Sequence, residues 1–170
     1  MQKQRVLDPQ KFLSASLPPD LILAPMRIQD LDEVMRIEAL SFSNPWSRQQ
    51  FVDEIERNPL STPTVLKKSG REQEVAGYCV CWVVAGELHI NNIAINPQDR
   101  GQGNGEILMQ WALDFGRMSG CRRAVLEVRV TNEKAIRLYQ RLGFETLGVA
   151  PSYYEDTGED AYIFVKNLKA

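Results

Sequence analysis

Apolar residues along the chain repeat with two different periods, which alternate from segment to segment. Two-residue alternation and short β-branched runs predict seven strands, at about residues 21–26, 62–68, 74–85, 87–96, 123–130, 144–151 and 160–168. Spacings of three and four predict four helices, at about residues 31–40, 48–57, 104–119 and 132–142. Strands and helices intermixed in this order predict an α/β fold, a mixed sheet with helices on both faces.

The first predicted helix has an apolar face made by Leu31, Val34, Ile37 and Leu40. Asp30 stands three residues before a glutamate, which is the spacing of a capping box at the start of that helix.

Two later helices also have capping residues at their starts. Ser47 and Gln50 have the spacing of a second capping box. Asn132 is placed to cap the last helix.

Length and composition fit one globular unit. The chain has 170 residues, 44% of them hydrophobic and 25% charged, with a net charge of −2. Residues 1–20 are polar with three prolines and are interpreted as an N-terminal extension, and residues 21–170 as the domain. No block of lysine and arginine predicts nucleic-acid binding, and no apolar run predicts a membrane span or a signal peptide. We therefore expect a cytoplasmic protein, monomeric by default.

The three cysteines predict neither a disulfide scaffold nor a metal centre. Cys79 and Cys81 lie two apart in a predicted strand, so their side chains face the same way, and Cys121 is distant in sequence. A Cys-x-Cys metal site would need further ligands, and no histidine or carboxylate has the spacing. We expect free buried thiols and no metal.

A glycine-rich turn follows the predicted strand at 87–96. Arg100 precedes Gly101, Gly103 and Gly105, which alternate into the start of a helix. Unobstructed backbone N–H groups at a helix N-terminus can hold phosphate, and an arginine can add a charged contact. An ordinary glycine turn remains an alternative. The spacing fits neither a dinucleotide fingerprint nor a nucleoside-triphosphate loop.

The strand at 123–130 has a carboxylate in its middle. Alternation places Glu127 and Arg129 on the face opposite Leu126. A carboxylate in such a place is costly unless it is paired or functional. An ion pair between Glu127 and an arginine therefore remains an alternative to a functional role. Tyr139, on the apolar face of the last helix, can likewise be a core residue.

Combined, the glycine motif, Leu126–Arg129, Asn132, Tyr139 and Leu142-Gly-Phe144 resemble the GNAT acetyltransferase superfamily. The resemblance runs from about residue 21 to the C-terminus. The narrower resemblance is to ribosomal-protein-alanine and eukaryotic N-terminal acetyltransferases, through the segments 42–47, 92–97, 126–129 and 153–162. It implies one GNAT-like domain: a mixed sheet of about seven strands flanked by four helices. The two central strands, at Ile93 and Glu127, would splay into a V.

The resemblance also implies a reaction, transfer of an acetyl group from acetyl-CoA to the α-amine of a protein N-terminus, such as that of a ribosomal protein. Glu127 would act as the base and Tyr139 as the acid. The residues expected to bind acetyl-CoA are Ile93, Ala94, Ile95, Arg100, Gly101, Gln102, Gly103, Asn104, Gly105, Glu106 and Asn132. Those expected to bind the acceptor are Phe42, Trp46, Tyr153 and Tyr154.

Four alternatives stay open. His89, the single histidine, is a second candidate base. Glu106, if it faced the phosphates, would repel them. A lysine or small-molecule amine is an alternative acceptor. An acyl-CoA-binding regulatory module without turnover is an alternative function, although such a module would need neither Glu127 nor Tyr139. First-residue preference at a protein N-terminus is not set by these motifs.

Overall fold

The computed structural model describes residues 8–13, 16–70 and 74–169. Every predicted strand and helix forms within three residues of its expected bounds. The strands are β1 (Leu21–Pro25), β2 (Ser61–Lys68), β3 (Val75–Val84), β4 (Glu87–Ile95), β5 (Arg123–Arg129), β6 (Glu145–Tyr154) and β7 (Glu159–Asn167). The helices are α1 (Leu31–Ser41), α2 (Arg48–Glu56), α3 (Asn104–Met118) and α4 (Glu133–Arg141). Short 3-10 turns are η1 (Pro9–Phe12), η2 (Ile28–Asp30) and η3 (Pro97–Asp99).

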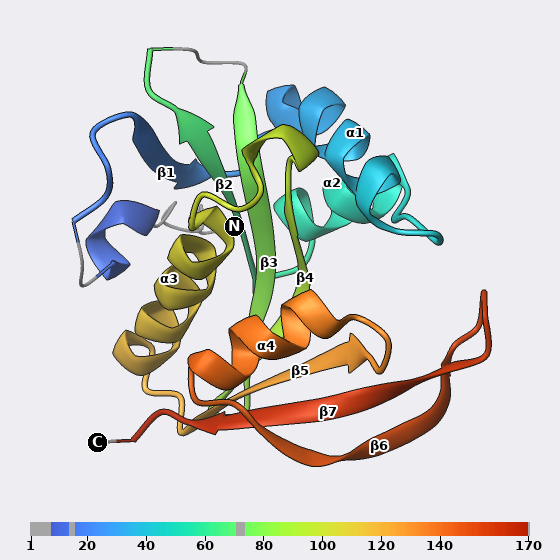
Figure 1. Cartoon of the computed structure of the whole chain (residues 1–170). Helices are drawn as coiled ribbons and strands as arrows, with labels where there is room; N and C mark the ends of the chain where they lie inside the picture. Colours follow the sequence, from blue (N-terminus) through green and yellow to red (C-terminus); the bar gives the residue numbers. More distant parts are fainter. Residues whose placement is uncertain (1–7, 14–15, 71–73, 170) are drawn as a thin grey trace.

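The strands form one sheet in the order β1-β2-β3-β4-β5-β7-β6. Neighbours are antiparallel except for β4 and β5, which run parallel. Helices cover both faces (Figure 1): α3 and α4 pack on one apolar cluster, and α1 and α2 on the other. The predicted mixed sheet of seven strands flanked by four helices is therefore confirmed.

The β4–β5 ladder is short, and its end creates an opening in the middle of the sheet. Pairing runs from Glu87 opposite Arg123 to Ile90 opposite Leu126 and goes no further. Beyond this point the two strands diverge, as Figure 1 shows. Each strand then has a backbone edge that lacks a ladder partner on the side of the opening.

A β-bulge lies where β4 begins to diverge. Val80 of β3 faces Asn92, whereas Cys81 faces Ile90, so Asn91 is an extra residue in β4. After the bulge, even-numbered residues point to the side of the sheet that odd-numbered residues occupied before it. Ile90 points to the α3 side, while two residues later Asn92 hydrogen-bonds to α1.

Helix caps agree with the sequence in two of three places. The Ser47–Gln50 capping box forms in both directions, and Asn132 accepts a hydrogen bond from the backbone N–H of Ala135 at 3.3 Å. Asp30 is the exception. It precedes α1 but does not cap it, because its buried carboxylate accepts from the Arg27 backbone and pairs with Lys67 at 2.5 Å.

The described part of the predicted N-terminal extension packs against α3. The Trp111 indole donates to the Pro9 carbonyl at 3.0 Å, and the Phe12 ring meets Phe115 edge-on at 5.2 Å. Residues 1–7 and 14–15 of that extension lie outside the described residues. Among the helices that the structure describes, none has the length and apolarity needed to cross a membrane.

Candidate active site

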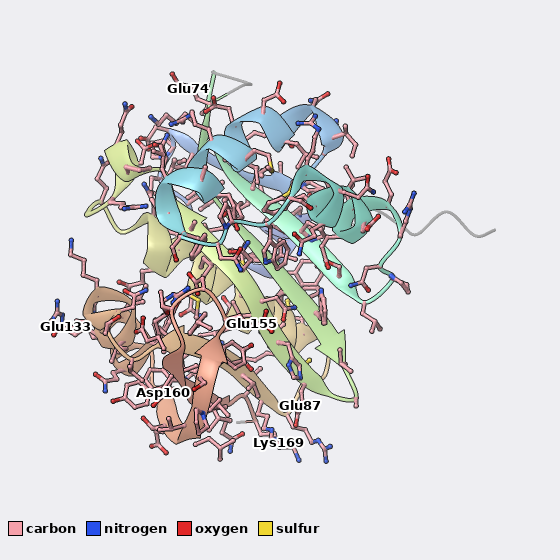
Figure 2. All side chains as sticks on the ribbon, turned by 90° about the vertical axis from the view of Figure 1, so that its right-hand side faces the viewer. Glu74, Glu87, Glu133, Glu155, Asp160 and Lys169 are labelled. Atoms are coloured by element: carbon pink, nitrogen blue, oxygen red, sulfur yellow. The ribbon has the colours of Figure 1, made fainter. Side chains whose placement is uncertain are left out.

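A cavity of about 820 Å³ opens where β4 and β5 diverge. Three walls enclose it: the α1–α2 loop, the diverging strands, and α4 together with the β6–β7 hairpin. Figure 2 shows Glu155, one of its lining residues, on that hairpin and Glu133 at the start of α4. The cavity brings together eight residues predicted from the sequence: Phe42, Trp46, Ile93, Glu127, Asn132, Tyr139, Tyr153 and Tyr154.

Glu127 enters the cavity from β5 without a partner. It is half-buried, and its carboxylate has neither a hydrogen bond nor an ion pair within the described part of the chain. The alternative, an ion pair between Glu127 and the nearby Arg129, does not form. Arg129 pairs instead with Asp156 at 2.9 Å and with Glu159 at 3.5 Å. A carboxylate left free beside a cavity is able to accept a proton.

Tyr139 combines a packing role with access to the cavity. Its ring lies 6.0 Å from Phe144 and 6.3 Å from Phe164, so the core interpretation is correct as far as the ring is concerned. The residue also lines the cavity. Burial raises the pKa of the Tyr139 hydroxyl, so the hydroxyl keeps its proton at neutral pH and can donate it.

The two adjacent tyrosines lie on the hairpin, because β6 extends three residues beyond its predicted end, to Tyr154. Their rings meet edge-on at 5.0 Å. The guanidinium of Arg129 lies 3.9 Å from the centre of the Tyr154 ring. Burial, together with the neighbouring Tyr153, raises the pKa of Tyr154 to about 12. Both hydroxyls therefore remain neutral hydrogen-bonding groups at the cavity.

A bridge of polar side chains joins two walls of the cavity. Ser43 of the α1–α2 loop donates to Asp156 of the hairpin turn, and Arg129 donates to the same carboxylate at 2.9 and 3.0 Å. The Ser43 hydroxyl and then the Arg129 guanidinium lower the pKa of Asp156. We call Ser43, Asp156 and Arg129 the polar bridge.

Phe42 and Trp46 of the α1–α2 loop line the cavity and also pack on the core below it. The Trp46 ring lies 5.2 Å from Phe51 of α2. Both aromatic residues therefore combine core packing with a place in the cavity wall.

The glycine-rich turn has the backbone that phosphate binding needs. Gly101 and Gly103 adopt φ of +75° and +84°, and nothing lies within 4 Å of a Cβ placed on either. Gly103 is the N-cap of α3, a helix of 15 residues whose first backbone N–H groups have no partner in the helix. These donors and the positive end of the helix dipole suit an anion.

The polar side chains of this turn make their contacts with other parts of the protein. Arg100 donates to the Ile95 carbonyl at 3.0 Å and to the Ser41 hydroxyl at 2.9 Å. Asn104 is buried and donates to the Asp99 carbonyl at 2.9 Å. Glu106 is exposed, and its carboxylate lies 3.9 Å from Arg141 of α4. Backbone groups therefore supply the donors for an anion at this turn.

His89 and the cysteines lie away from the cavity lining. His89 is 3.3 Å from Glu87 on the far half of β4. All three cysteines are buried and free. Within residues 8–13, 16–70 and 74–169, no three histidine, cysteine, aspartate or glutamate side chains gather as a metal-binding group.

Comparison with known proteins agrees with this geometry. Residues 31–144 match the model of the acetyltransferase (GNAT) family. The chain belongs to the GNAT acetyltransferase family. Its relatives include a Bacillus subtilis protein provisionally named ribosomal protein bS18-alanine N-acetyltransferase, 43% identical over 138 residues, which are 81% of this chain and 89% of the relative.

Two solved structures share the GNAT fold of this chain. The crystal structure of the ribosomal-protein-S18-alanine N-acetyltransferase of Escherichia coli has a TM-score of 0.78 at 28% identity, covering 88% of this chain and 95% of that one. Arabidopsis thaliana NAA60 in complex with acetyl-CoA also has a TM-score of 0.78, covering 86% and 98% of the two chains. Its identity is 18%, so it shows the fold alone.

One residue of the cavity that the sequence did not predict is Glu38 of α1. Its fully buried carboxylate lines the cavity and accepts from the Trp46 backbone at 2.8 Å, from the Asn92 amide at 3.0 Å, and from the Tyr78 hydroxyl. The signal was available, because position 38 is seven residues after Leu31 and therefore on the apolar stripe. Leu40, predicted on that stripe, is 59% exposed instead.

Proposed function

We propose that this enzyme transfers the acetyl group of acetyl-CoA to the α-amine of a protein N-terminus, and that ribosomal protein bS18 is its acceptor. The observation that carries the proposal is the unpartnered Glu127 carboxylate in a cavity that Tyr139 also lines. The names of the Bacillus and Escherichia relatives support the acceptor. A ribosomal acceptor would place the enzyme in the cytoplasm.

Acetyl-CoA would lie along the opening between β4 and β5. The free edge of β4 at Ile93–Ile95 offers backbone groups to the amides of the pantetheine arm, as a further strand would. The N–H groups from Gly101 to Glu106 would hold the pyrophosphate. Asn132, which caps α4 and lines the cavity, would contact the pantetheine end.

Glu127 and Tyr139 supply the proton transfers. An α-amine has a pKa near 8, so at neutral pH it binds largely as an ammonium group that cannot attack. Glu127 would accept one proton, directly or through a water, and the amine nitrogen would then bond to the thioester carbon. The bonded nitrogen then carries one proton more than an amide does. As the carbon–sulfur bond breaks, the Tyr139 hydroxyl would give its proton to the departing thiolate, and the surplus proton on the nitrogen would restore the Tyr139 hydroxyl, directly or through a water. The products are the N-acetylated chain and CoA.

The acceptor would enter between the two aromatic walls. Phe42 and Trp46 on one side and Tyr153 and Tyr154 on the other flank the cavity. The polar bridge joins these walls through Ser43 and Asp156. A space closed on opposite sides suits the end of a polypeptide, which supports a protein N-terminus as the acceptor.

The test is an acetylation assay with short peptides that differ only at their first residue, among them the N-terminal sequence of bS18. Peptides with a blocked α-amine and a free lysine are the matched controls, and mass spectrometry locates the added acetyl group. Acetylation of free N-termini, strongest for the bS18 sequence, is the expected result. Transfer confined to lysine would contradict the proposed acceptor. Acetyl-CoA binding without any transfer would favour a regulatory module.

A further inference from the structure

The β4 bulge leaves a polar side chain without a partner at the cavity. Asn91 lines the cavity, and its side-chain amide nitrogen is buried but makes no hydrogen bond to any described residue. The adjacent Asn92 differs, because its amide donates to Glu38 at 3.0 Å. A buried donor without an acceptor is unfavourable for folding, so such a group at a binding cavity points to a ligand.

The direction of the strand places Asn91 on the acceptor side of the sheet. Ile90 belongs to the cluster under α3, so the following residue faces the opposite side, toward α1 and α2. Asn92 also faces that side, since it hydrogen-bonds to α1. Ile93 returns to the α3 side, where it packs on the same cluster as Ile90. Asn91 therefore shares a face with Glu127, whose neighbour Leu126 belongs to the α3-side cluster.

We propose that Asn91 is an acceptor-binding residue, whose amide N–H donates to the carbonyl oxygen of the acceptor's first residue. The inference rests on the proposed function, because it takes a peptide N-terminus as the acceptor. In such a chain the first carbonyl is separated from the α-amine by one carbon. When the α-amine of the peptide is held near Glu127, the carbonyl oxygen of its first residue therefore lies on the same face of the sheet and can accept a hydrogen bond. A simple alkylamine or a lysine ε-amine has no carbonyl so close.

The Asn91 amide would orient the peptide and would take no part in proton transfer. A hydrogen bond to the first carbonyl fixes one of the rotations that aim the amine nitrogen at the thioester. It would also distinguish α-amino-acyl groups from other amines, because a buried donor left unpaired disfavours the wrong acceptor. Acetyl-CoA also has a carbonyl oxygen that could accept from the Asn91 amide. The experiment distinguishes a hydrogen bond to acetyl-CoA from one to the peptide.

The experiment is a four-way comparison of two enzymes and two acceptors. Wild type and Asn91→Leu, which removes the donor at similar size, are assayed with a preferred peptide and with the same peptide carrying a thioamide as its first linkage. Sulfur is a weak hydrogen-bond acceptor. Any effect of the thioamide on the α-amine itself is common to both enzymes and cancels in the comparison.

For wild type, the thioamide should lower kcat/KM about tenfold, the effect of losing one hydrogen bond. Asn91→Leu should lower kcat/KM for the normal peptide by about the same factor and show little further loss with the thioamide. The KM for acetyl-CoA should not change. Thermal stability should stay level or rise, since an unpaired polar group has been removed. Asn91→Ala, which adds no bulk, serves as a second variant with the same expected pattern.

Equal thioamide effects in wild type and variant would overturn the assignment while leaving N-terminal acetylation intact. A raised KM for acetyl-CoA with an unchanged thioamide effect would assign the amide to the donor instead. Lowered stability with equal losses for both substrates would make Asn91 structural. If wild type acetylates no peptide N-terminus, the proposed function fails and the Asn91 inference fails with it.

Discussion

Two of the carboxylates that line the cavity, Glu38 and Glu127, have contrasting surroundings. Glu38 accepts hydrogen bonds from three donors and is fully buried. Glu127 is half-buried and has no such bond among the described residues. A carboxylate held by three donors fixes the positions of its neighbours, whereas a carboxylate without such bonds is available to a ligand. The same functional group thus serves as a scaffold on α1 and as a candidate base on β5.

Replacing Glu127 should separate catalysis from binding. Glu127→Gln keeps the shape of the side chain but cannot accept the ammonium proton, so kcat should fall by about 10²–10⁴. Acetyl-CoA binding, measured by calorimetry, should be unchanged. Glu133→Gln makes the same change on the exposed start of α4 and should behave as wild type. An unaffected kcat in Glu127→Gln would remove this residue from the mechanism.

Tyr139→Phe should lower kcat while the fold persists, because the ring contacts with Phe144 and Phe164 need no hydroxyl. Burial raises the pKa of Tyr139 above its usual value near 10, so the acid stays protonated through the neutral and mildly alkaline range. Wild-type kcat should therefore stay level from about pH 8 to pH 10 with no loss from this group. A descending limb centred below pH 9 that disappears in Tyr139→Phe would contradict the raised pKa.

Sequence alone predicted several residues that line the cavity but not the buried glutamate that holds them in place. Glu127 stood out because a charge in a central strand demands an explanation, and the family resemblance supplied one. Glu38 was missed because a glutamate in a helix is usually on the solvated side. Its three donors come from β3, β4 and the α1–α2 loop, which only the folded chain brings together.

At the scale of elements, the hairpin of β6 and β7 depends on Arg129 for its position. This arginine ends β5 and contacts the hairpin turn at Asp156, Thr157 and Glu159. It also lies against the Tyr154 ring at 3.9 Å. One side chain therefore ties the hairpin and its Tyr154 to the strand that carries Glu127.

Loosening the polar bridge should affect the acceptor and spare the donor. Asp156→Asn removes the charge that Arg129 and Ser43 both bind, so the KM for the peptide should rise about two- to tenfold, as expected for a partly exposed polar contact. The KM for acetyl-CoA should not move. Asp53→Asn, which breaks an exposed pair with Arg57 on α2, is the matched control. A change in both KM values would point to a wider disturbance of the sheet.

The C-terminal end of β6 could not be predicted from the hydrophobic pattern. Its predicted end at residue 151 fell at a proline, yet the strand continues to Tyr154. Register irregularities between Ala150 and Tyr154 accommodate the interruption. The extension depends on pairing with β7, for which Tyr154 faces Glu159, and local sequence does not encode that pairing.

Across the whole molecule, the order of elements was recoverable from periodicity because each strand and helix has a clear apolar face. The divergence of β4 and β5 was expected only from the family resemblance, and their parallel pairing was not predicted. The apolar pattern of β4 did contain a sign of the bulge. Leu88 and Ile90 occupy even positions, whereas Ile93 and Ile95 occupy odd ones, and all four belong to the α3 side.

Alkaline pH should destabilise the folded protein through its buried tyrosines. Burial raises the pKa of both Tyr78 and Tyr139. In the unfolded chain tyrosine ionises near pH 10, so above that pH the unfolded state loses protons that the folded state keeps. Stability is thus fully present below about pH 10 and declines above it, by at most about 1.4 kcal/mol per pH unit for each such tyrosine.

Urea unfolding at about pH 9, 10 and 11 measures this decline. Tyr139→Phe should show a shallower decline than wild type, because one ionising group has been removed. Lysines and thiols titrate equally in both proteins and cancel in the comparison. Identical slopes would mean that Tyr139 ionises as easily in the folded protein as in the unfolded chain.

The bulge in β4 decides which side chains of the strand face the cavity. If β4 kept all its residues but paired with β3 in an uninterrupted ladder beyond Ile90, Asn92 and Ala94 would turn toward α3 and α4, and Ile93 and Ile95 toward α1. The amide that now reaches Glu38 would face an apolar core, and two isoleucines would face the place of a buried carboxylate. Deleting position 91 would instead leave the faces as they are, because Asn92 would then follow Ile90 in the register that Val80 and Cys81 already have. The fold should therefore tolerate a deletion at this point better than one farther along β4, which would turn the residues after it to the opposite face.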